Sequence, residues 1–315
     1  MKTQSKLSLV CLLMAAVMLL PGCSSQGAGN QSDNAGTAVS SGQVSAKDKE
    51  KSDYLLSRVK YFDSDGTCTR SVMFEYNEKG KWVHRVQQDY EFERTDESFY
   101  TYPDDFTRQE TYIDEDTGNR DQVITTTYNE AGDILTETST DYRADGSENI
   151  MSRTEYTYDK HGNLIRKEDH STATVGQELS HTNITEYTYD NAGNRLTEKL
   201  TGFSYDGEER VFADCEYQYD NKGNRIREIS NIADEYIYSP IVYEYNGKGK
   251  KTKEYNYAST APDTLKQYFV YEFDENGNKK KYSRYSAEDQ LLSYAEYEYI
   301  KISDLQGKGE TTPEK

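Results

Sequence analysis

The chain has few of the residues that usually form a catalytic or metal-binding site. Its 315 residues include four histidines, four cysteines and one tryptophan. The histidines lack the spacing of metal ligands, and there is no Gly-x-Ser-x-Gly elbow, phosphate-binding glycine loop or Cys-x-x-Cys. The sequence therefore predicts a protein that is not an enzyme and holds no metal and no cofactor.

Large aliphatic residues are also scarce. Only 34% of the residues are hydrophobic, and that fraction includes 29 tyrosines. Such a composition argues against a thick two-layer core. Tyrosine suits a thin sheet, in which the rings pack on neighbouring strands while the hydroxyls reach water. Because cross-strand aromatic pairs contribute about 0.2–1 kcal/mol each, stability is expected to accumulate along a repetitive sheet.

Positive charge is in deficit. The net charge is −19, and loss of Lys2 and Lys6 with an N-terminal leader would make the chain more acidic still. An acidic protein is repelled by phosphate backbones and by anionic lipid. We therefore expect no nucleic-acid partner and no adhesion of the protein body to anionic membranes.

What the sequence has in abundance is one short repeat. The clearest copy, residues 187–194, reads Tyr-Thr-Tyr-Asp-Asn-Ala-Gly-Asn. The glycines of this copy and of its closer and looser relatives are Gly132, Gly162, Gly193, Gly223, Gly249 and Gly277. They are 30, 31, 30, 26 and 28 residues apart, a spacing typical of a repeat array.

Each repeat reads as a β-hairpin. Tyr-x-Tyr places two rings on one face of a strand, and Asp-x-x-Gly suits a type I turn followed by a residue with positive φ. A second turn signal lies halfway to the next copy, at Asp145-Gly146, Gly176, Asp206-Gly207, Pro240 and Pro262. The sequence therefore predicts an all-β fold, a repetitive antiparallel meander of hairpins that is open or curled.

The repeat resembles the YD repeat of the Rhs/YD-repeat family of bacterial surface and secreted proteins. The resemblance covers residues 70–300 and rests on several copies, of which Tyr189-Asp190-x-x-Gly193-Asn194 is typical. It implies long strips of antiparallel sheet, which in the largest members coil into a shell around a C-terminal toxin. No room for a toxin follows the repeats here, so the resemblance implies the fold without toxin delivery.

The N-terminus reads as a lipoprotein signal. Lys2 and Lys6 precede an apolar run from Leu7 to Leu20, which is short for a transmembrane helix. Residues 20–23, Leu-Pro-Gly-Cys, resemble the lipobox of bacterial lipoproteins, which implies that Cys23 is lipidated. An ordinary secretory signal is the alternative. We therefore expect a protein anchored by lipid at the extracytoplasmic face of the cell membrane.

The predicted organisation follows from composition. Residues 1–22 form the signal peptide, residues 23–46 the lipidated cysteine and a flexible linker, residues 47–300 the repeat domain and residues 301–315 a disordered tail. Residues 47–60 read as a first strand or short cap. Residues 82–121 are the least regular part of the domain, either a degenerate repeat or a recognition region.

The remaining cysteines, Cys68 and Cys215, are expected to be unpaired. In an open meander about nine strand steps of about 4.8 Å would separate them, far beyond the Cα separation of about 7 Å that a disulfide tolerates. A bond between them would show that the sheet closes or folds back.

A row of tyrosines is the best candidate for binding. Its members are Tyr156, Tyr158, Tyr187, Tyr189, Tyr217 and Tyr219. They either hold the sheet together or present ring faces to an envelope glycan or a surface protein. The predicted function is non-catalytic binding or scaffolding at the cell envelope. A component of an Rhs-like toxin system, which would enclose a cavity, and a glycan hydrolase with paired carboxylates are the alternatives.

Overall fold

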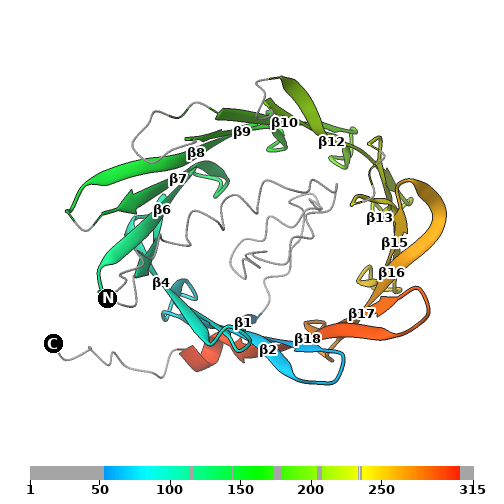
Figure 1. Ribbon diagram of the computed structural model, residues 1–315, viewed down its shortest axis with the longest axis horizontal. Helices are drawn as coiled ribbons and strands as arrows, with labels where there is room; N and C mark the ends of the chain where they lie inside the picture. Colours follow the sequence, from blue (N-terminus) through cyan, green and yellow to red (C-terminus); the bar gives the residue numbers. More distant parts are fainter. Residues whose placement is uncertain are drawn as a thin grey trace, which may run out of the picture.

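The structure, a computed structural model, consists of one antiparallel sheet of 18 strands (Figure 1). It describes residues 53–113, 117–143, 145–172, 179, 181–203, 208–232, 234 and 236–305. The strands are β1 Tyr54–Asp63, β2 Cys68–Tyr76, β3 Trp82–Asp89, β4 Arg94–Asp104, β5 Thr107–Ile113, β6 Arg120–Tyr128, β7 Ile134–Tyr142, β8 Glu148–Tyr158, β9 Leu164–Ser171, β10 His181–Tyr189, β11 Arg195–Phe203, β12 Glu209–Tyr219, β13 Arg225–Ser230, β14 Tyr238–Tyr245, β15 Lys251–Ala258, β16 Ala261–Phe273, β17 Lys279–Ser286 and β18 Leu291–Lys301. The prediction of an all-β antiparallel repeat sheet is confirmed.

The sheet is closed into a barrel, so the prediction of an open or curled sheet is wrong. Each strand pairs with the next along the chain, and β1 also pairs with β18, from Tyr54 opposite Lys301 to Asp63 opposite Ser293. The prediction did not include the pairing of the first strand with the last. Because β1 carries hydrogen-bonding edges on both sides, it joins the two ends of the meander and removes both free edges.

The repeat glycines lie at hairpin tips, as predicted. At the clearest copy the Gly193 N–H donates to the Asp190 carbonyl (3.1 Å) and the Asp190 N–H to the Asn194 carbonyl (2.9 Å). Gly193 has a φ of 83°, which glycine adopts without a Cβ clash. The Asp190 carboxylate accepts the N–H groups of Ala192 (2.9 Å) and Asn194 (2.8 Å), and also the Asn194 side-chain amide (2.8 Å). The side chain of Asp190 therefore stabilises the hairpin tip, whereas the side chains at positions 191 and 192 take no part in these hydrogen bonds.

Replacing Asp190 by alanine is expected to destabilise the protein by about 2 kcal/mol, because it removes three hydrogen bonds to a charged acceptor. Urea denaturation followed by circular dichroism measures this cost. Asn191→Ala, at an exposed position of the same tip, is the control and is expected to stay within about 0.5 kcal/mol of the wild type. Equal costs for the two variants would contradict this account of the turn.

The second set of turn signals is correct only in part. Gly146 has a φ of 81° at the tip between β7 and β8, as predicted, whereas Gly176 and Asp206-Gly207 lie outside the described residues. Pro240 and Pro262 lie inside β14 and β16 rather than at turns. Among the described residues, the chain bends or turns just before these strands instead, at residues 231–232 and 236 before β14 and at residues 259–260 before β16.

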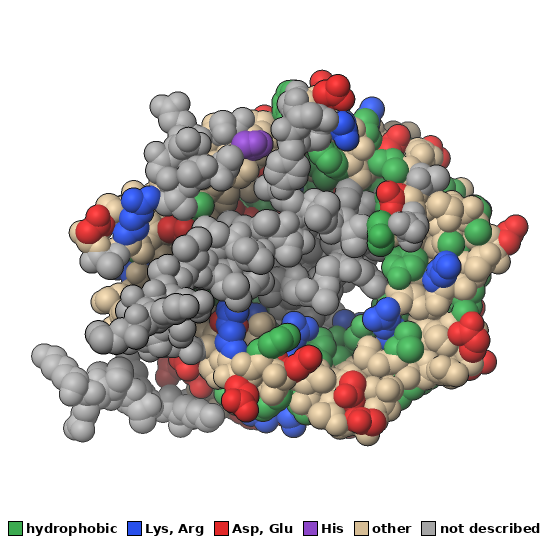
Figure 2. All heavy atoms as spheres, in the orientation of Figure 1, with side chains coloured by type: hydrophobic (Ala, Val, Ile, Leu, Met, Phe, Trp, Pro, Cys, Tyr) green, Lys and Arg blue, Asp and Glu red, His purple; other side chains and the backbone are tan. Residues whose placement is uncertain are grey.

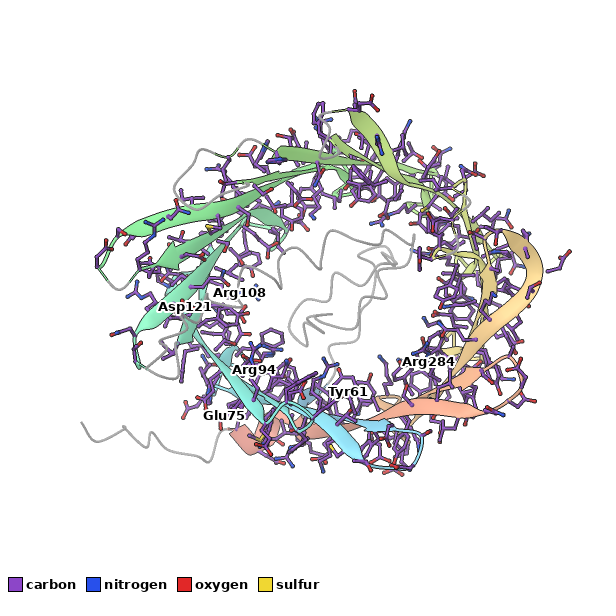
Figure 3. All side chains as sticks on the ribbon, viewed as in Figure 1. Tyr61, Glu75, Arg94, Arg108, Asp121 and Arg284 are labelled. Carbon is purple, nitrogen blue, oxygen red and sulfur yellow. The ribbon has the colours of Figure 1, made fainter. Side chains whose placement is uncertain are left out.

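The two faces of the sheet differ because side chains alternate along every strand. The repeat tyrosines lie on the inner face. Residues opposite each other on paired strands lie on the same face, so Glu198, which opposes Tyr187, and Cys215, which opposes Glu198, lie on the inner face as well. Figure 3 shows Tyr61, Arg108 and Arg284 on the inner side of the ring and Glu75 on the outer side. The core is therefore a layer on the inside of the wall rather than a filling between two sheets.

One cluster of buried apolar residues lies where the ring closes, and another lies at β12 around Cys215. Leu56 and Val59 of β1 and Ala295 of β18 are 4%, 3% and 0% exposed and form one cluster. The rings of Tyr61, Phe74, Tyr282, Tyr297 and Tyr299 pack against this cluster. The segment that was expected to form a first strand or a short cap therefore forms a strand, β1, which is paired on both sides.

The described residues of 82–121 form regular strands, which corrects the interpretation of this region as the least regular part of the domain. They contribute β3, β4, β5 and the start of β6, and each strand from β2 to β7 pairs with the next, with a register shift in every pairing except that of β3 with β4. After β18, a short 3₁₀ helix at Ile302–Leu305 buries Leu305. No helix among the described residues has the length and apolar character needed to cross a membrane.

Cys68 and Cys215 are not bonded to each other. Cys68 is a free thiol, as expected. Cys215, completely buried in β12, is disulfide-bonded, so the expectation that both cysteines are unpaired is wrong for this residue. Cys23, the predicted lipidation site, and the boundaries predicted before residue 53 lie outside the described residues.

Candidate functional site

The six candidate tyrosines lie together on the inner face, but most of their hydroxyls form hydrogen bonds within the sheet. In three successive hairpins the second tyrosine donates to a carbonyl of the preceding hairpin. These bonds join Tyr158 to Ile134 (2.9 Å), Tyr189 to Leu164 (2.7 Å) and Tyr219 to Arg195 (2.7 Å). The same bond recurs at Tyr245 to Arg225 (2.7 Å). The second tyrosine therefore ties each hairpin to the one before it.

The first tyrosine of each repeat contacts charged side chains. Tyr156 donates to Glu137 (2.6 Å) and Tyr217 to Glu198 (2.9 Å), while the Arg195 guanidinium lies 4.3 Å from the ring centre of Tyr187. Burial, followed by the nearby glutamates, raises the pKa of all three hydroxyls, so the tyrosines stay neutral donors. Most of the ring surface and hydroxyls in this row is thus already used inside the wall.

A repeated charged unit connects β11 to β16, and we call it the charged row. In each member a cation lies three residues before a glutamate and forms an ion pair with it, and a tyrosine from the next hairpin donates to that glutamate. The members are Arg195 and Glu198 with Tyr217, Arg225 and Glu228 with Tyr243, and Lys251 and Glu254 with Tyr271. The row brings no net charge, since each glutamate is matched by one cation.

Glu228 is the most buried glutamate of the charged row. It is 1% exposed, and its Oε2 lies 3.3 Å from Arg225 and 3.0 Å from the Tyr243 hydroxyl. Burial raises the pKa of its carboxyl to about 7, against the opposing effect of Arg225. Its Oε1 has no hydrogen-bond partner in the part of the chain that the structure describes. Glu228 therefore changes its charge near neutral pH.

The inner face holds further buried polar atoms without partners among the described residues. They include both amide atoms of Asn256, Oγ of Ser139 and Nε of Arg108. Asn256 opposes Ile241, which in turn opposes Glu228, so two of these groups lie on neighbouring hairpins. Buried polar groups are usually satisfied, so the inner face has unused capacity for hydrogen bonds.

The outer face is solvated and charged. Lys60 pairs with Glu298 (2.9 Å), Arg166 with Glu168 (2.8 Å), and His84 lies 3.2 Å from Glu97. A stack of Tyr255, Tyr268 and Tyr285 crosses three strands, with ring centres 5.9 and 5.0 Å apart. The central ring therefore turns its faces toward its neighbours rather than outward.

The charged row was missed by the sequence reasoning, although a signal for it is present. Counted from the turn glycine, a cation stands two residues later and a glutamate five residues later in three consecutive repeats. Once the pairing of the strands is known, that spacing places both charges beside the repeat tyrosines. Without the strand pairing, it cannot be distinguished from the many other charge pairs of an acidic chain.

Among the described residues, no group of three or more His, Cys, Asp or Glu side chains is arranged to hold a metal ion. The inner glutamates contact cations and tyrosines instead. The arrangement suits hydrogen bonding and charge pairing within the wall, where burial raises the pKa of Glu228 to about 7.

No protein-family model matches the chain, and no curated protein matches it. Among solved structures it is similar to TcdB2-TccC3, at 12% identity over 76% of this chain with a TM-score of 0.29. The match spans only 16% of that protein. It is also similar to porin-like proteins from Bacteroides vulgatus ATCC 8482 (12% identity, 78% of this chain, 98% of that chain, TM-score 0.42) and Bacteroides uniformis ATCC 8492 (13%, 78%, 96%, 0.38). At these scores the likenesses carry no argument about function, and membership of the Rhs/YD-repeat family stays a prediction.

Proposed function

We propose that the protein is a non-catalytic lipoprotein of the cell envelope that binds or scaffolds a partner inside its tyrosine-rich ring. The proposal includes the lipid on Cys23, a location at the extracytoplasmic face of the cell membrane, and membership of the Rhs/YD-repeat family. The partner classes are those expected from the sequence, an envelope glycan or a surface protein. The repeat and the leader support these parts of the proposal.

Closure of the ring is the observation that carries the proposal. Side chains fill a barrel of about 8 strands, whereas a barrel of about 16 to 18 strands leaves an open interior. This ring has 18 strands, and Figure 2 shows hydrophobic side chains and Lys and Arg side chains along part of its inner rim. A ring of this size supports enclosure better than presentation of an outer strip.

Photo-crosslinking tests where the partner binds. A benzophenone amino acid replaces Tyr61, which Figure 3 shows on the inner side of the ring. As the matched control it replaces Phe62, the next residue of the same strand, whose side chain lies on the opposite face because side chains alternate. After irradiation of intact cells, a covalent adduct is expected from position 61 and not from position 62. Adducts from position 62 alone would contradict binding inside the ring.

The mass of the mature protein tests the anchor separately. Protein extracted from membranes is expected to lack residues 1–22 and to carry acyl chains on Cys23, and Cys23→Ser is expected to abolish both changes. Because this mature form has neither Cys11 nor a free Cys23 thiol to pair with Cys215, its Cys215 is expected to react as a thiol after denaturation. An unmodified Cys23 would refute the lipid anchor and leave the binding result intact.

Two other functions each have one observation in their favour. A component of an Rhs-like toxin system is expected to enclose a cavity, which the closed ring permits. A glycan hydrolase needs a carboxylic acid that stays protonated near neutrality, and Glu228 has a pKa of about 7. Release of reducing sugar from peptidoglycan by the wild type but not by Glu228→Gln would establish the second of these.

A further inference from the structure

The ring has one weak junction, and it is not where the chain ends meet. Between β13 and β14 only two residue pairs are in register, Arg227 with Val242 and Glu228 with Ile241. At the closure, β1 and β18 pair along nearly their full lengths. β13 is also the shortest of the described strands, with 6 residues. The β13–β14 junction therefore has the fewest ladder hydrogen bonds to break.

A proline and two serines explain why the pairing stops there. Pro240 stands in the middle of β14 and has no N–H, so it cannot donate to either neighbouring strand. The next ladder position is filled by a side chain instead, since the Ser230 N–H donates to the Ser239 hydroxyl (2.8 Å). A hydroxyl that rotates replaces a fixed carbonyl at this point.

The Glu228 carboxylate spans the same junction. It belongs to β13, and its Oε2 accepts the hydroxyl of Tyr243 from β14. The titratable and charged groups around it are Tyr217 and Cys215 of β12, Arg225 of β13, Tyr243 of β14 and, one hairpin away on either side, Glu198 with Arg195 and Glu254 with Lys251. Cys215 is disulfide-bonded and does not titrate, and burial raises the pKa of Tyr217 and Tyr243, so both hydroxyls stay neutral. The pKa of Glu228, in contrast, is raised to about 7.

We propose that the β13–β14 junction is a seam through which the ring wall opens, and that ionisation of Glu228 favours opening. An ionised Glu228 has a buried oxygen, Oε1, that no described residue hydrogen-bonds, whereas in the opened seam water solvates both oxygens. The seam would admit a partner sideways into the ring and would expose two strand edges for pairing. This inference does not depend on which partner the ring encloses.

The sign of the pH effect follows from linkage. The pKa of Glu228 is about 7 in the closed wall and ordinary, near 4.5, once water reaches it. The closed form therefore binds the proton more tightly, and its advantage is lost as pH rises through 7. Between pH 6 and pH 8 the opening equilibrium constant is expected to rise about tenfold.

Hydrogen exchange read by mass spectrometry tests the seam in the full-length protein. After correction for the intrinsic pH dependence of exchange, peptides from β13 and β14 are expected to be less protected than those from β1 and β18. Their protection is expected to fall about tenfold from pH 6 to pH 8, while that of β1 and β18 does not change with pH. Equal protection at the two junctions, or a seam that does not respond to pH, would overturn the proposal.

Variants separate Glu228 from its neighbours. Glu228→Gln keeps the shape and removes the charge, so the pH response of the seam is expected to disappear. Glu254→Gln makes the same change one hairpin away, at 3% exposure, and is expected to keep the response. A response unchanged in Glu228→Gln, or lost equally in Glu254→Gln, would refute the role of Glu228.

A covalent lock tests opening even if Glu228→Gln folds poorly. Arg227 and Val242 oppose each other across the seam, close enough for a disulfide between cysteines placed there. In Arg227→Cys with Val242→Cys, the oxidised protein is expected to lose the pH-dependent exchange, and reduction is expected to restore it. Exchange that stays pH-dependent in the oxidised protein would show that the wall does not open at this junction.

Discussion

Val59→Asp is expected to unfold the whole ring rather than one hairpin. Val59 is 3% exposed in β1, opposite Tyr297 of β18 and Val72 of β2. An aspartate there buries a charge with no cation in the surrounding cluster, at a cost of about 3–5 kcal/mol. That is a large fraction of a typical folding free energy. Because β1 joins both ends of the meander, its loss leaves two free edges and no closed wall.

Two probes distinguish global from local unfolding. Far-ultraviolet circular dichroism reports all strands, and the fluorescence of Trp82, the only tryptophan, reports β3. In urea both transitions are expected to shift together to lower concentration. Lys60→Ala, one residue away on the outer face, removes an exposed ion pair with Glu298 and is expected to cost less than about 1 kcal/mol. Loss of only part of the dichroism signal in Val59→Asp would mean that the strands fold as independent repeats.

Features set by residues close in the chain were predictable from the sequence. Residues 187–194 contain everything that the hairpin tip needs, an aspartate acceptor, a glycine for positive φ and two rings on one side of a strand. The structure adds the role of Asn194, whose amide donates to the Asp190 carboxylate across the turn. That bond is local too, and the repeated Asn after Gly was its signal.

Closure could not be predicted, because it depends on two strands at opposite ends of the domain. β1 lies outside the clear repeats, and the sequence of residues 54–63 does not indicate that this strand pairs with β18. The decision between an open and a closed sheet is a long-range one, made by the apolar cluster of Leu56, Val59 and Ala295. The prediction of a turn at Pro240 was wrong for a related reason, since whether a proline ends a strand or interrupts its pairing with a neighbour, as Pro240 of β14 does toward β13, depends on the neighbouring strand.

In the candidate site, too, local features were predictable from the sequence and features that depend on distant residues were not. Alternation along a strand correctly placed the six tyrosines on one face, but it did not say which face is inside. The partners of their hydroxyls depend on register, which sets Tyr217 beside Glu198 and Tyr243 beside Glu228. The pKa of Glu228 depends on its burial in the complete barrel wall, so it cannot be predicted from a short stretch of sequence.

Tyr243→Phe is expected to destabilise the protein in a pH-dependent way. Its hydroxyl donates to Oε2 of Glu228, and this bond favours the ionised carboxyl by lowering its pKa against the larger effect of burial. At pH 8 Glu228 is mostly ionised, and loss of a hydrogen bond to a charged group costs about 1.5–3 kcal/mol. At pH 5.5 the carboxyl is protonated, and the same loss costs about 1 kcal/mol. The variant is therefore expected to be closer to the wild type in acid.

Tyr245→Phe on the same strand is the matched control, because its hydroxyl donates to the Arg225 carbonyl (2.7 Å), which does not titrate. It is expected to cost about 1 kcal/mol at both pH values. Urea denaturation of the two variants and the wild type at pH 5.5 and 8 gives four differences in unfolding free energy. If the cost of Tyr243→Phe does not depend on pH, or if Tyr245→Phe shows the same dependence, Glu228 does not ionise in the folded wall near neutrality. In that case the charged row is a fixed structural element and the seam needs another trigger.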